Sequence, residues 1–449
     1  MHVQSIRPEK SSRGKRPLAG VGGWRLPGAL LIAVALAGCA TGRPLMPAPV
    51  VYTQGAEEPF VDVVPALQSA EADVLYVTDR IPEQDEQGRL TYGIGRSPSV
   101  AFGSAVVRFG EGASWQDLTA QAQGGEAALE LRLISVREQA RAPETPLEWT
   151  LVDGQPVTNP EDEAKNQVVQ DALCTELGLR LAMTPRKEVF VFVHGVQNTF
   201  QDSVFTIAEL WHYFGRAGVP AVFSWPAGYG GLLRGYTYDR ESGEFAVFHV
   251  KQFLLALTRC SQVERISIIA HSRGTDVVAT ALREMTIAER AAGRDPRRTL
   301  RLQNIVLAAP DLDLGVVLQR VASERVVASA KRFTIYSSGN DKAISISEML
   351  FGGLARIGQL SFLTASNEKP AMVGRRQNGN AAFVEYTGES GGSAGHSYFR
   401  ENPAVSSDLV LAIRYDRDPG VENGRPLRHV EGAFWVIDDT YLSGTASHP

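Results

Sequence analysis

The stretch Ile268-Ile269-Ala270-His271-Ser272-Arg273-Gly274 passes from an apolar strand directly into a helical pattern. A strand–turn–helix with small residues on both sides of a serine is typical of the G-x-S-x-G nucleophile elbow. Gly274 keeps the second glycine of this pattern, whereas Ala270 replaces the first. The tight turn would push the Ser272 hydroxyl out above the sheet edge, at a helix N-terminus whose dipole favours developing negative charge. Ser272 is therefore the candidate nucleophile; the alternative is a serine that only caps the helix.

Apolar runs typical of strands alternate with helical patterns around this turn and along most of the chain. The alternation predicts an α/β fold, a mostly parallel central sheet with helices on both faces. Motifs at the carboxyl ends of such strands should gather at one edge of the sheet. The predicted strands are Asp73–Thr78, Ser104–Phe109, Leu131–Val136, Glu188–Val193, Ala221–Trp225, Arg265–Ala270, Leu302–Ala308, Arg332–Tyr336 and Ala381–Tyr386. The predicted helices are Glu161–Leu181, Asp202–Ala217, Arg240–Arg259, Arg273–Arg290, Leu314–Ala330, Ala343–Ile357 and Pro403–Ile413.

The composition excludes several classes of protein. The chain has 449 residues, of which 44% are hydrophobic and 21% charged, which is ordinary globular usage. Neither chain-wide disorder nor a multi-span membrane protein fits these values. The formal net charge of −5 argues against a nucleic-acid-binding surface. Three cysteines cannot form a disulfide framework, and whether Cys174 pairs with Cys260 stays open.

The N-terminal segment resembles a lipoprotein signal peptide over residues 1–38. Its uncharged run, Leu26–Ala37, is too short to span a membrane. Leu36-Ala37-Gly38-Cys39 resembles the bacterial lipobox, whose cysteine becomes the lipidated first residue; an ordinary signal peptide is the alternative. The basic residues that precede the uncharged run are Arg7, Lys10, Arg13, Lys15, Arg16 and Arg25.

Cleavage before Cys39 would remove six basic residues and one acidic residue, so the net charge would change from −5 to −10. Residues 39–65 are predicted to form the lipidated cysteine and a flexible tether, because they are rich in proline and small residues and lack periodicity. Residues 66–449 are predicted to form a single domain. We expect the protein to be lipid-anchored in the bacterial envelope, and Ala40 after the cysteine favours the periplasmic face of the outer membrane.

A serine nucleophile needs a base within hydrogen-bond reach. In hydrolases built on the nucleophile elbow, the base comes last along the chain, on a loop. His396 lies in such a Gly-rich loop after the last predicted strand, whereas His429 lies in a tail that is typical of a strand. His396 is therefore the candidate base and His429 the alternative. The other six histidines lie near the chain ends, in strand-end turns or inside predicted helices: His2, His194, His212, His249, His271 and His448.

The carboxylate that orients the base should lie between serine and histidine in the sequence. Asp341 follows the predicted strand Arg332–Tyr336, and Asp311 follows Leu302–Ala308. Asp341 is preferred because it belongs to the later strand, with Asp311 as the alternative acid that could otherwise shape the pocket. A helix N-cap is the competing role for Asp341, since a helix is predicted to begin two residues later.

The oxyanion of a tetrahedral intermediate needs backbone N–H donors already in place. Arg273, the residue after the nucleophile, supplies one candidate donor. The loop after Glu188–Val193 supplies the other, from Val196 or, as the alternative, Gln197. An ordinary tight turn is the competing interpretation of this loop, and one loop can serve both purposes.

Together these motifs resemble the α/β-hydrolase superfamily, and more closely a bacterial family of α/β-hydrolases of unknown function. The resemblance runs from about Asp73 to Ile413 and implies hydrolase chemistry without a substrate. Ala270 and the long cationic side chain of Arg273 are its departures from the elbow pattern. The stretches that carry it are Tyr76-Val77-Thr78-Asp79-Arg80, the loop at His194, Phe223-Ser224-Trp225-Pro226, Tyr238-Asp239-Arg240-Glu241-Ser242, Ala308-Ala309-Pro310-Asp311 and Gly395-His396-Ser397-Tyr398-Phe399.

The sequence therefore predicts a serine hydrolase, an envelope-anchored esterase or lipase-like enzyme that cleaves acyl ester bonds through Ser272, His396 and Asp341. Two alternatives remain, a catalytically inactive binding protein of the same fold and an acyltransferase. The chain carries no P-loop, HExxH or dinucleotide-binding pattern, and we expect no cofactor and no metal. The expected partners are a small-molecule or lipid acyl ester and, through Cys39, the membrane. The Trp225-Pro226 segment could wall the acyl pocket, although such aromatic side chains more often pack in a core.

Overall fold

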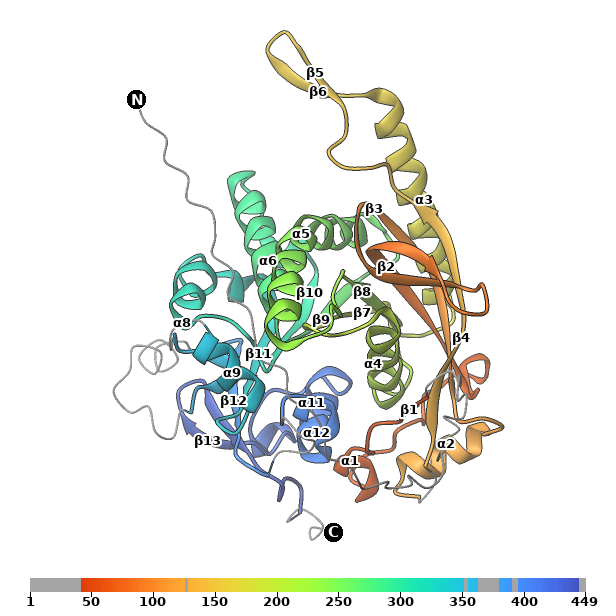
Figure 1. Ribbon diagram of the computed structural model, residues 1–449. Helices are drawn as coiled ribbons and strands as arrows, with labels where there is room; N and C mark the ends of the chain where they lie inside the picture. The colour runs from red at the N-terminus through yellow and green to blue at the C-terminus, as the bar shows by residue number, and fades with distance from the viewer. Residues whose placement is uncertain (1–41, 126–127, 351–353, 362–378, 390–394, 444–449) are drawn as a thin grey trace, which may run out of the picture. The chain divides into compact units, whose positions relative to one another are not determined.

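One sheet, mostly parallel, runs through the computed structural model, which describes residues 42–125, 128–350, 354–361, 379–389 and 395–443. Figure 1 shows the chain in colour from the first described residues to the last. Neighbouring strands from β2 through β14 are parallel, and the strands outside them pair antiparallel. In order across the sheet, the strands are β1 (Arg43–Pro44), β4 (Glu130–Arg141), β3 (Leu90–Phe109), β2 (Glu71–Gln84), β8 (Val219–Ser224), β7 (Glu188–Val193), β9 (Arg265–His271), β10 (Leu302–Ala308), β11 (Ala330–Ser337), β12 (Ala381–Tyr386), β14 (Phe434–Ile437) and β13 (Arg428–Glu431).

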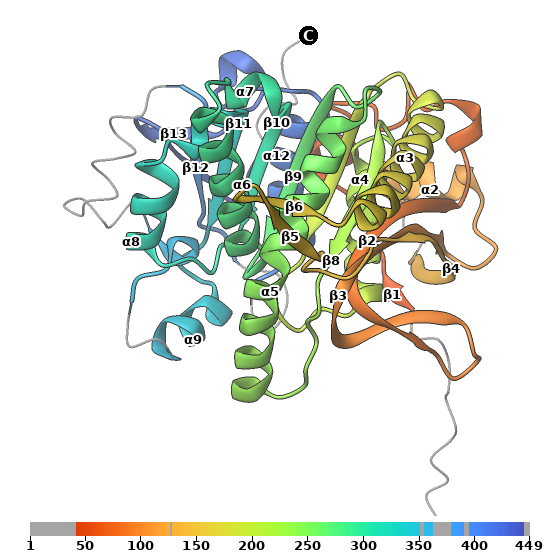
Figure 2. The ribbon, with the colours of Figure 1, turned by 90° about the horizontal axis from the view of Figure 1, so that it is seen from above.

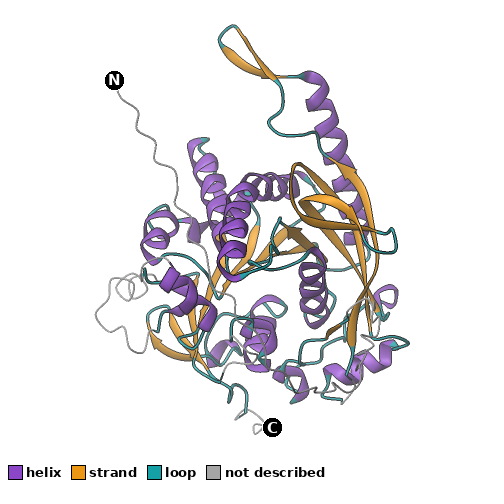
Figure 3. Ribbon diagram, viewed as in Figure 1, coloured by secondary structure: helices purple, strands orange, loops and turns teal. Residues whose placement is uncertain are grey.

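Helices flank the sheet, and Figure 3 separates them from the strands by colour. A second, two-stranded sheet joins β5 (Trp149–Val152) to β6 (Gln155–Thr158). The α-helices are α1 (Val50–Thr53), α2 (Trp115–Ala122), α3 (Pro160–Ala182), α4 (Phe200–Tyr213), α5 (Leu232–Arg259), α6 (Gly274–Ala291), α7 (Pro296–Thr299), α8 (Leu314–Val316), α9 (Lys342–Leu350), α11 (Tyr398–Glu401) and α12 (Pro403–Ile413). Shorter helical turns are η1 (Pro65–Leu67), η2 (Val317–Ala322), η3 (Val326–Ser329), η4 (Ile357–Gln359) and η5 (Val421–Asn423).

The central strand β7 shows why both faces of the sheet are covered. All six of its residues are buried, and successive side chains point to opposite faces. Phe190 and Phe192 belong to a hydrophobic core shared with α4 and α12. Val189, Val191 and Val193 belong to a second core shared with α3, α5 and α6. Figure 2 shows helices on either side of the sheet in this arrangement, and the predicted fold class is confirmed.

Several predicted elements have the bounds that the sequence indicates: β7, β10, β12 and α12. Strands β2 and β3 are longer than predicted, because their mutual pairing continues out to Gln84 and Leu90. Helix α4 begins earlier than predicted, at Phe200, since Thr199 forms a capping box with Asp202.

Several predicted helices are wrong in extent: α5 begins at Leu232 rather than Arg240, α4 ends at Tyr213 rather than Ala217, and two later helices differ more. The segment predicted as one helix over Leu314–Ala330 is divided into α8, η2 and η3, and Arg325 lies in the left-handed region with φ +54°. A non-glycine residue in that conformation interrupts a right-handed helix. The helix predicted over Ala343–Ile357 ends as α9 at Leu350, and Ile357 lies instead in η4.

The segment after Gly42 packs on the domain. The Arg43 guanidinium pairs with the buried Glu209 carboxylate of α4 at 2.7 Å, and the same carboxylate accepts the Met46 N–H at 3.2 Å. The Tyr52 hydroxyl donates to the Tyr213 carbonyl at 2.6 Å. Met46 and Tyr52 are both buried in the core that α4 shares.

The prediction of a flexible tether over residues 39–65 is therefore wrong from Arg43 onward, because this segment packs on the domain that was predicted to begin at residue 66. The segment shows no regular period because its contacts are irregular, and only the folded chain reveals the buried glutamate that it meets. The predicted signal peptide, residues 1–38, and Cys39 lie outside the described residues. Within the described ranges, no helix has both the length and the apolar character needed to cross a membrane.

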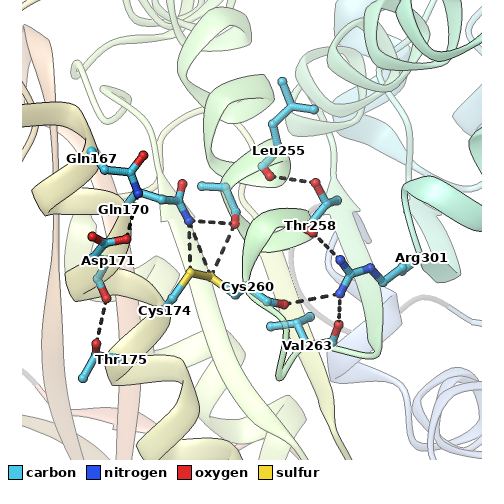
Figure 4. The surroundings of a disulfide bond; sticks show 11 residues. Gln167, Gln170, Asp171, Cys174, Thr175, Leu255, Thr258, Cys260, Val263 and Arg301 are labelled. Carbon is cyan, nitrogen blue, oxygen red and sulfur yellow. Dashed lines mark hydrogen bonds between the residues drawn. A yellow bond between two sulfur atoms is a disulfide. The ribbon is translucent and has the colours of Figure 1, made fainter. Parts of the chain in front are cut away.

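Cys174 of α3 and Cys260 at the end of α5 form a disulfide, which settles the pairing that the sequence leaves open. Their Cα atoms lie 5.1 Å apart, although 86 residues separate them along the chain. Figure 4 shows the Gln170 side chain beside this bond, where its amide donates to the Ala256 carbonyl at 3.1 Å. The bond therefore joins two helices on the same face of the sheet.

We predict that His212 makes stability depend on pH. It lies in α4 with no exposed surface, and burial together with Arg216 holds its pKa well below the ordinary 6.5. Below pH 6.5, His212 would bind a proton in the unfolded chain but not in the folded chain. The free energy of unfolding should therefore fall by up to about 1.4 kcal/mol for each pH unit. In the His212→Asn variant this loss should be absent. Urea unfolding of both proteins across this range would show the stability gap constant above pH 6.5 and narrowing below it; a gap independent of pH would contradict the prediction.

Candidate active site

Ser272 lies in a strained turn between β9 and α6. Its φ of +54° places it in the left-handed region, which a residue with a side chain seldom adopts. Hydrogen bonds hold the turn: the Ser272 N–H donates to the Ala308 carbonyl at 3.0 Å, and the Ser272 carbonyl accepts from the N–H of Thr275 at 3.1 Å and of Asp311 at 3.3 Å. This is the conformation that a nucleophile elbow requires.

Two glycines let the neighbouring loop approach this turn. A Cβ on Gly274 would lie 2.3 Å from the His194 carbonyl oxygen and 2.6 Å from that of Val193. A Cβ on Gly195 would lie 2.6 Å from the Ser272 Cβ. The loop after β7 therefore lies directly against the serine, close enough for a backbone N–H to reach a group bound there.

The candidate base and acid are hydrogen-bonded to each other. His396 Nδ1 lies 2.7 Å from Asp341 Oδ2, and the Asp341 side chain has no exposed surface. The other carboxylate oxygen, Oδ1, accepts the N–H groups of Ala343 and Ile344, each at 3.0 Å. Asp341 thus both caps the following helix and holds the imidazole, so the two roles considered from the sequence coexist.

His396 also lies beside the residue that precedes the serine. The rings of His396 and His271 are 4.6 Å apart, and His271 Nε2 lies 3.2 Å from the His396 carbonyl oxygen. Burial, with His396 as the next cause, holds the pKa of His271 well below its ordinary value. A neutral His271 adds no repulsion when its neighbour gains a proton.

Ser272 is not yet engaged by the base. Within the described residues, no hydrogen bond joins the Ser272 hydroxyl to His396. Catalytic hydrogen bonds are often long in unliganded enzymes and shorten when substrate binds. The structure thus pairs His396 with Asp341 and places both near the elbow, while the serine contact stays open.

The alternative acid, Asp311, lies in a different cluster. Its carboxylate accepts the Tyr236 hydroxyl and the Ser347 hydroxyl, the latter at 2.7 Å, and lies 3.6 Å from the Arg356 guanidinium. No hydrogen bond joins Asp311 to His396 in the described part of the chain. The alternative base, His429, is exposed on β13, where Nε2 lies near the Gly432 carbonyl. The geometry therefore favours Asp341 and His396.

Two backbone N–H groups of the loop after β7, those of Val196 and Gln197, were considered as oxyanion donors. The Gln197 N–H donates to Asp239 Oδ2 at 2.7 Å. Among the described residues, the N–H groups of Val196 and Arg273 have no acceptor. The candidate oxyanion donors Val196 and Arg273 are thus available, and the alternative Gln197 is not.

Asp239 fixes the shape of this loop, a role that sequence reasoning missed. Besides the Gln197 N–H, its carboxylate accepts the N–H groups of Gly228 and Tyr229, at 3.2 and 3.3 Å. Burial raises the pKa of the Asp239 carboxyl, whereas these N–H donors lower it. Two loops that follow different strands therefore share one buried carboxylate.

Arg80 has a similar role from the other side. Its guanidinium is buried, and burial lowers its pKa to about 10, so it stays charged at neutral pH. Both residues lie in stretches that carry the family resemblance, Tyr76–Arg80 and Tyr238–Ser242, which was the available signal. The guanidinium contacts are Ser224 Oγ at 3.0 Å, the carbonyls of Gly93 at 3.0 Å, Ala227 at 2.8 Å and Asn198 at 2.8 Å, and His194 Nε2 at 3.4 Å.

Trp225 packs rather than lining an open pocket. It has no exposed surface and stacks on His194 with ring centroids 4.9 Å apart. Its indole N–H donates to the His194 carbonyl at 2.7 Å. Burial, then Arg80, holds the pKa of His194 well below its ordinary value, so this imidazole acts as a neutral structural group.

Over the ranges that the structure describes, no group of three or more His, Cys, Asp or Glu side chains is placed to hold a metal.

We predict that Gly274→Ala destabilises the protein by about 2–3 kcal/mol, because the added methyl would overlap backbone oxygens that cannot rotate away. The matched control is Gly230→Ala, where a Cβ would meet nothing within 4 Å, and the change should stay within about 0.5 kcal/mol. Urea unfolding measures both. Equal effects of the two substitutions would mean that β7 and the elbow are not in close contact.

The comparison with protein families agrees with this architecture. The family described as alpha/beta hydrolase of unknown function (DUF900) matches residues 169–414, which include the candidate serine, acid and base. The apo form of Thermogutta terrifontis esterase 2 is similar in structure, with 15% identity, a TM-score of 0.28, and 54% of this chain and 86% of that chain covered. Phospholipase PlaB from Legionella pneumophila gives 12% identity and a TM-score of 0.22, covering 47% of this chain and 42% of that chain. No curated protein matches in sequence. Because the family match spans more than half of the chain, this protein belongs to the α/β-hydrolase family of unknown function.

Proposed function

We propose that this protein is a serine hydrolase that cleaves acyl ester bonds through an acyl-enzyme on Ser272. The observation that carries the proposal is the 2.7 Å hydrogen bond between His396 and the buried Asp341, beside a serine held at positive φ. A strained turn has an energetic cost of about 1–3 kcal/mol and persists where the surrounding structure enforces it, often at functional sites.

The first half of the reaction acylates the serine. His396 Nε2 takes the proton from the Ser272 hydroxyl as the oxygen attacks the ester carbonyl. The N–H groups of Val196 and Arg273 hold the oxygen that becomes negative. When the tetrahedral intermediate collapses, His396 returns the proton to the leaving alcohol. The acyl group then remains on Ser272.

The second half repeats these steps with water as the nucleophile and releases a carboxylic acid. Asp341 fixes the Nδ1–H tautomer of His396, which leaves Nε2 free to accept the proton. An alcohol acceptor in place of water would make the same site an acyltransferase.

Covalent labelling with a fluorophosphonate tests the nucleophile. We expect the Ser272 oxygen to displace fluoride, so that a peptide centred on this residue gains the phosphonyl group in mass spectrometry. His396→Ala should abolish labelling. Asp341→Asn should lower the labelling rate by about a thousandfold or more, while the matched Asp311→Asn should change it little.

Other outcomes would contradict the proposal. A folded protein that does not label at Ser272 would favour a non-catalytic binding protein. Equal loss of labelling in Asp311→Asn and Asp341→Asn would contradict the assignment of the acid. Product analysis with and without alcohol acceptors separates hydrolysis from acyl transfer.

We also propose that the protein is anchored to the bacterial envelope by lipid on Cys39 and faces the periplasm. The Cys174–Cys260 disulfide supports an oxidising compartment. Only residues 40–42 lie between Cys39 and β1, so an anchor there would hold the domain close to the membrane surface. Membrane-derived acyl esters would then be accessible substrates.

We predict that Cys39→Ser releases the protein from the membrane fraction and abolishes incorporation of a palmitate analogue, because the thiol is the site of acylation. Ala40→Ser is the matched control and should retain both properties. Cell fractionation measures membrane association, and metabolic labelling with the palmitate analogue measures acylation. Membrane association and labelling that persist in Cys39→Ser would show that another residue is modified or that the protein is held differently.

A further inference from the structure

A cavity of about 940 Å³ lies apart from the candidate active site. It is bounded by α3, by α5 and by the strap that leads from β4 to α3 through the β5–β6 hairpin. Its lining contains none of Ser272, Asp341 and His396. The volume falls in the range of sites that hold ligands.

Most of the cavity wall is apolar. Phe102 of β3 and Val77 of β2 contribute from the sheet, Leu173 from α3 and Phe253 from α5. All four side chains are buried, so the inner wall belongs to the core of the domain. The cavity can therefore accept apolar groups against this inner wall, while polar side chains such as Gln167 and Gln252 line other parts of it.

The two helical walls are held together covalently. The Cys174–Cys260 disulfide joins α3 to the end of α5, and Gln170 bridges the same helices through its bond to the Ala256 carbonyl. Figure 4 shows both links side by side. A cavity with fixed walls is pre-formed, which lowers the entropy cost of binding.

The apolar lining continues outward along the hairpin. Trp149 lies at the cavity mouth and is 60% exposed. Across the hairpin Trp149 pairs with Thr158, and Leu151 pairs with Pro156, so these side chains share one face. Leu151 is 65% exposed. Figure 1 shows β5 and β6 standing clear of the main sheet and its helices.

The hairpin also presents free backbone groups. It has only two strands, and no hydrogen bond joins the outer edge of either strand to another described residue. An unpaired edge beside apolar pockets is the arrangement that extended polypeptides use when they add a strand.

The charge of the strap indicates which kind of molecule would bind here. Between Ala142 and Ala164 the chain has no lysine or arginine. Nearby, Lys165 pairs with Asp162 at 3.3 Å, and Arg259 contributes one positive group to the cavity wall. The field at the mouth is therefore negative and attracts a cationic partner. The acidic residues of this stretch are Glu144, Glu148 and Asp153 in the strap and Glu161, Asp162 and Glu163 in the first turn of α3.

We infer that this cavity and the adjoining hairpin face bind an extended polypeptide segment that carries apolar and basic side chains. The segment pairs with an open edge of the β5–β6 hairpin. Its apolar side chains enter the cavity over Trp149, and its basic side chains meet the acidic strap.

The test measures binding of labelled synthetic peptides to the purified chain by fluorescence anisotropy, in a Ser272→Ala background that removes any hydrolysis. A peptide of alternating Val and Lys should bind. Peptides of alternating Val and Glu, and of alternating Ser and Lys, should bind at least about tenfold more weakly, since each lacks one of the two required features.

Substitutions at the hairpin locate the site. Leu151→Asp should weaken binding of the Val–Lys peptide by at least about tenfold. Val421→Asp is the matched control, because Val421 is 72% exposed and lies in η5, outside the cavity lining. Circular dichroism should show both variants folded, as each residue is on the surface.

Three results would overturn the inference. One is the absence of binding by the Val–Lys peptide. A second is equal affinity of the Leu151→Asp and Val421→Asp variants. The third is self-association of the chain that Leu151→Asp abolishes, which would assign the hairpin face to a second copy of the protein.

Discussion

The close contact between the loop after β7 and the turn after β9 is the constraint on which the candidate site depends. A side chain at Gly274 or Gly195 would overlap backbone or serine atoms across this contact. Ser272 is held at a φ of +54° because its N–H bonds to Ala308 of β10 and its carbonyl accepts from Asp311 in the loop after β10. The loop that carries the Val196 N–H is thereby brought beside the serine, before any substrate binds.

Two buried side chains, Arg80 and Asp239, fix the loop after β7 in this position. Arg80 and Asp239 together bond to the loops after β7 and β8, and neither side chain is open to solvent. Burying a charge raises the free energy of the folded state unless hydrogen bonds compensate for the lost water. Loop conformations that break these hydrogen bonds are therefore strongly disfavoured. The preceding residue, Asp79, points elsewhere and pairs at 2.9 Å with His249, which lines the cavity beside α3 and α5. Consecutive residues of β2 therefore support two separate parts of the surface.

Much of the fold was predictable because its signals are local. A doubly covered strand such as Glu188–Val193 is continuously apolar, and its bounds follow from the residues alone. The flexible tether was wrong because the contacts of Arg43 and Tyr52 are with Glu209 and Tyr213, far along the chain. The long helix over Leu314–Ala330 was wrong because a period of apolar residues does not reveal a backbone interruption at Arg325.

The sequence by itself determined the elbow at Ser272, the strand–helix alternation and the residue types of the candidate site, since each is a pattern among near neighbours. Only the tertiary structure decided that Asp341 rather than Asp311 holds His396, across 55 residues. It also decided that Cys174 pairs with Cys260, that the Gln197 N–H is already engaged, and that the β5–β6 hairpin adjoins a cavity. These outcomes depend on distances between segments that are remote in sequence. The packing of helices on the large sheet sets those distances, and a local pattern of residues carries no information about them.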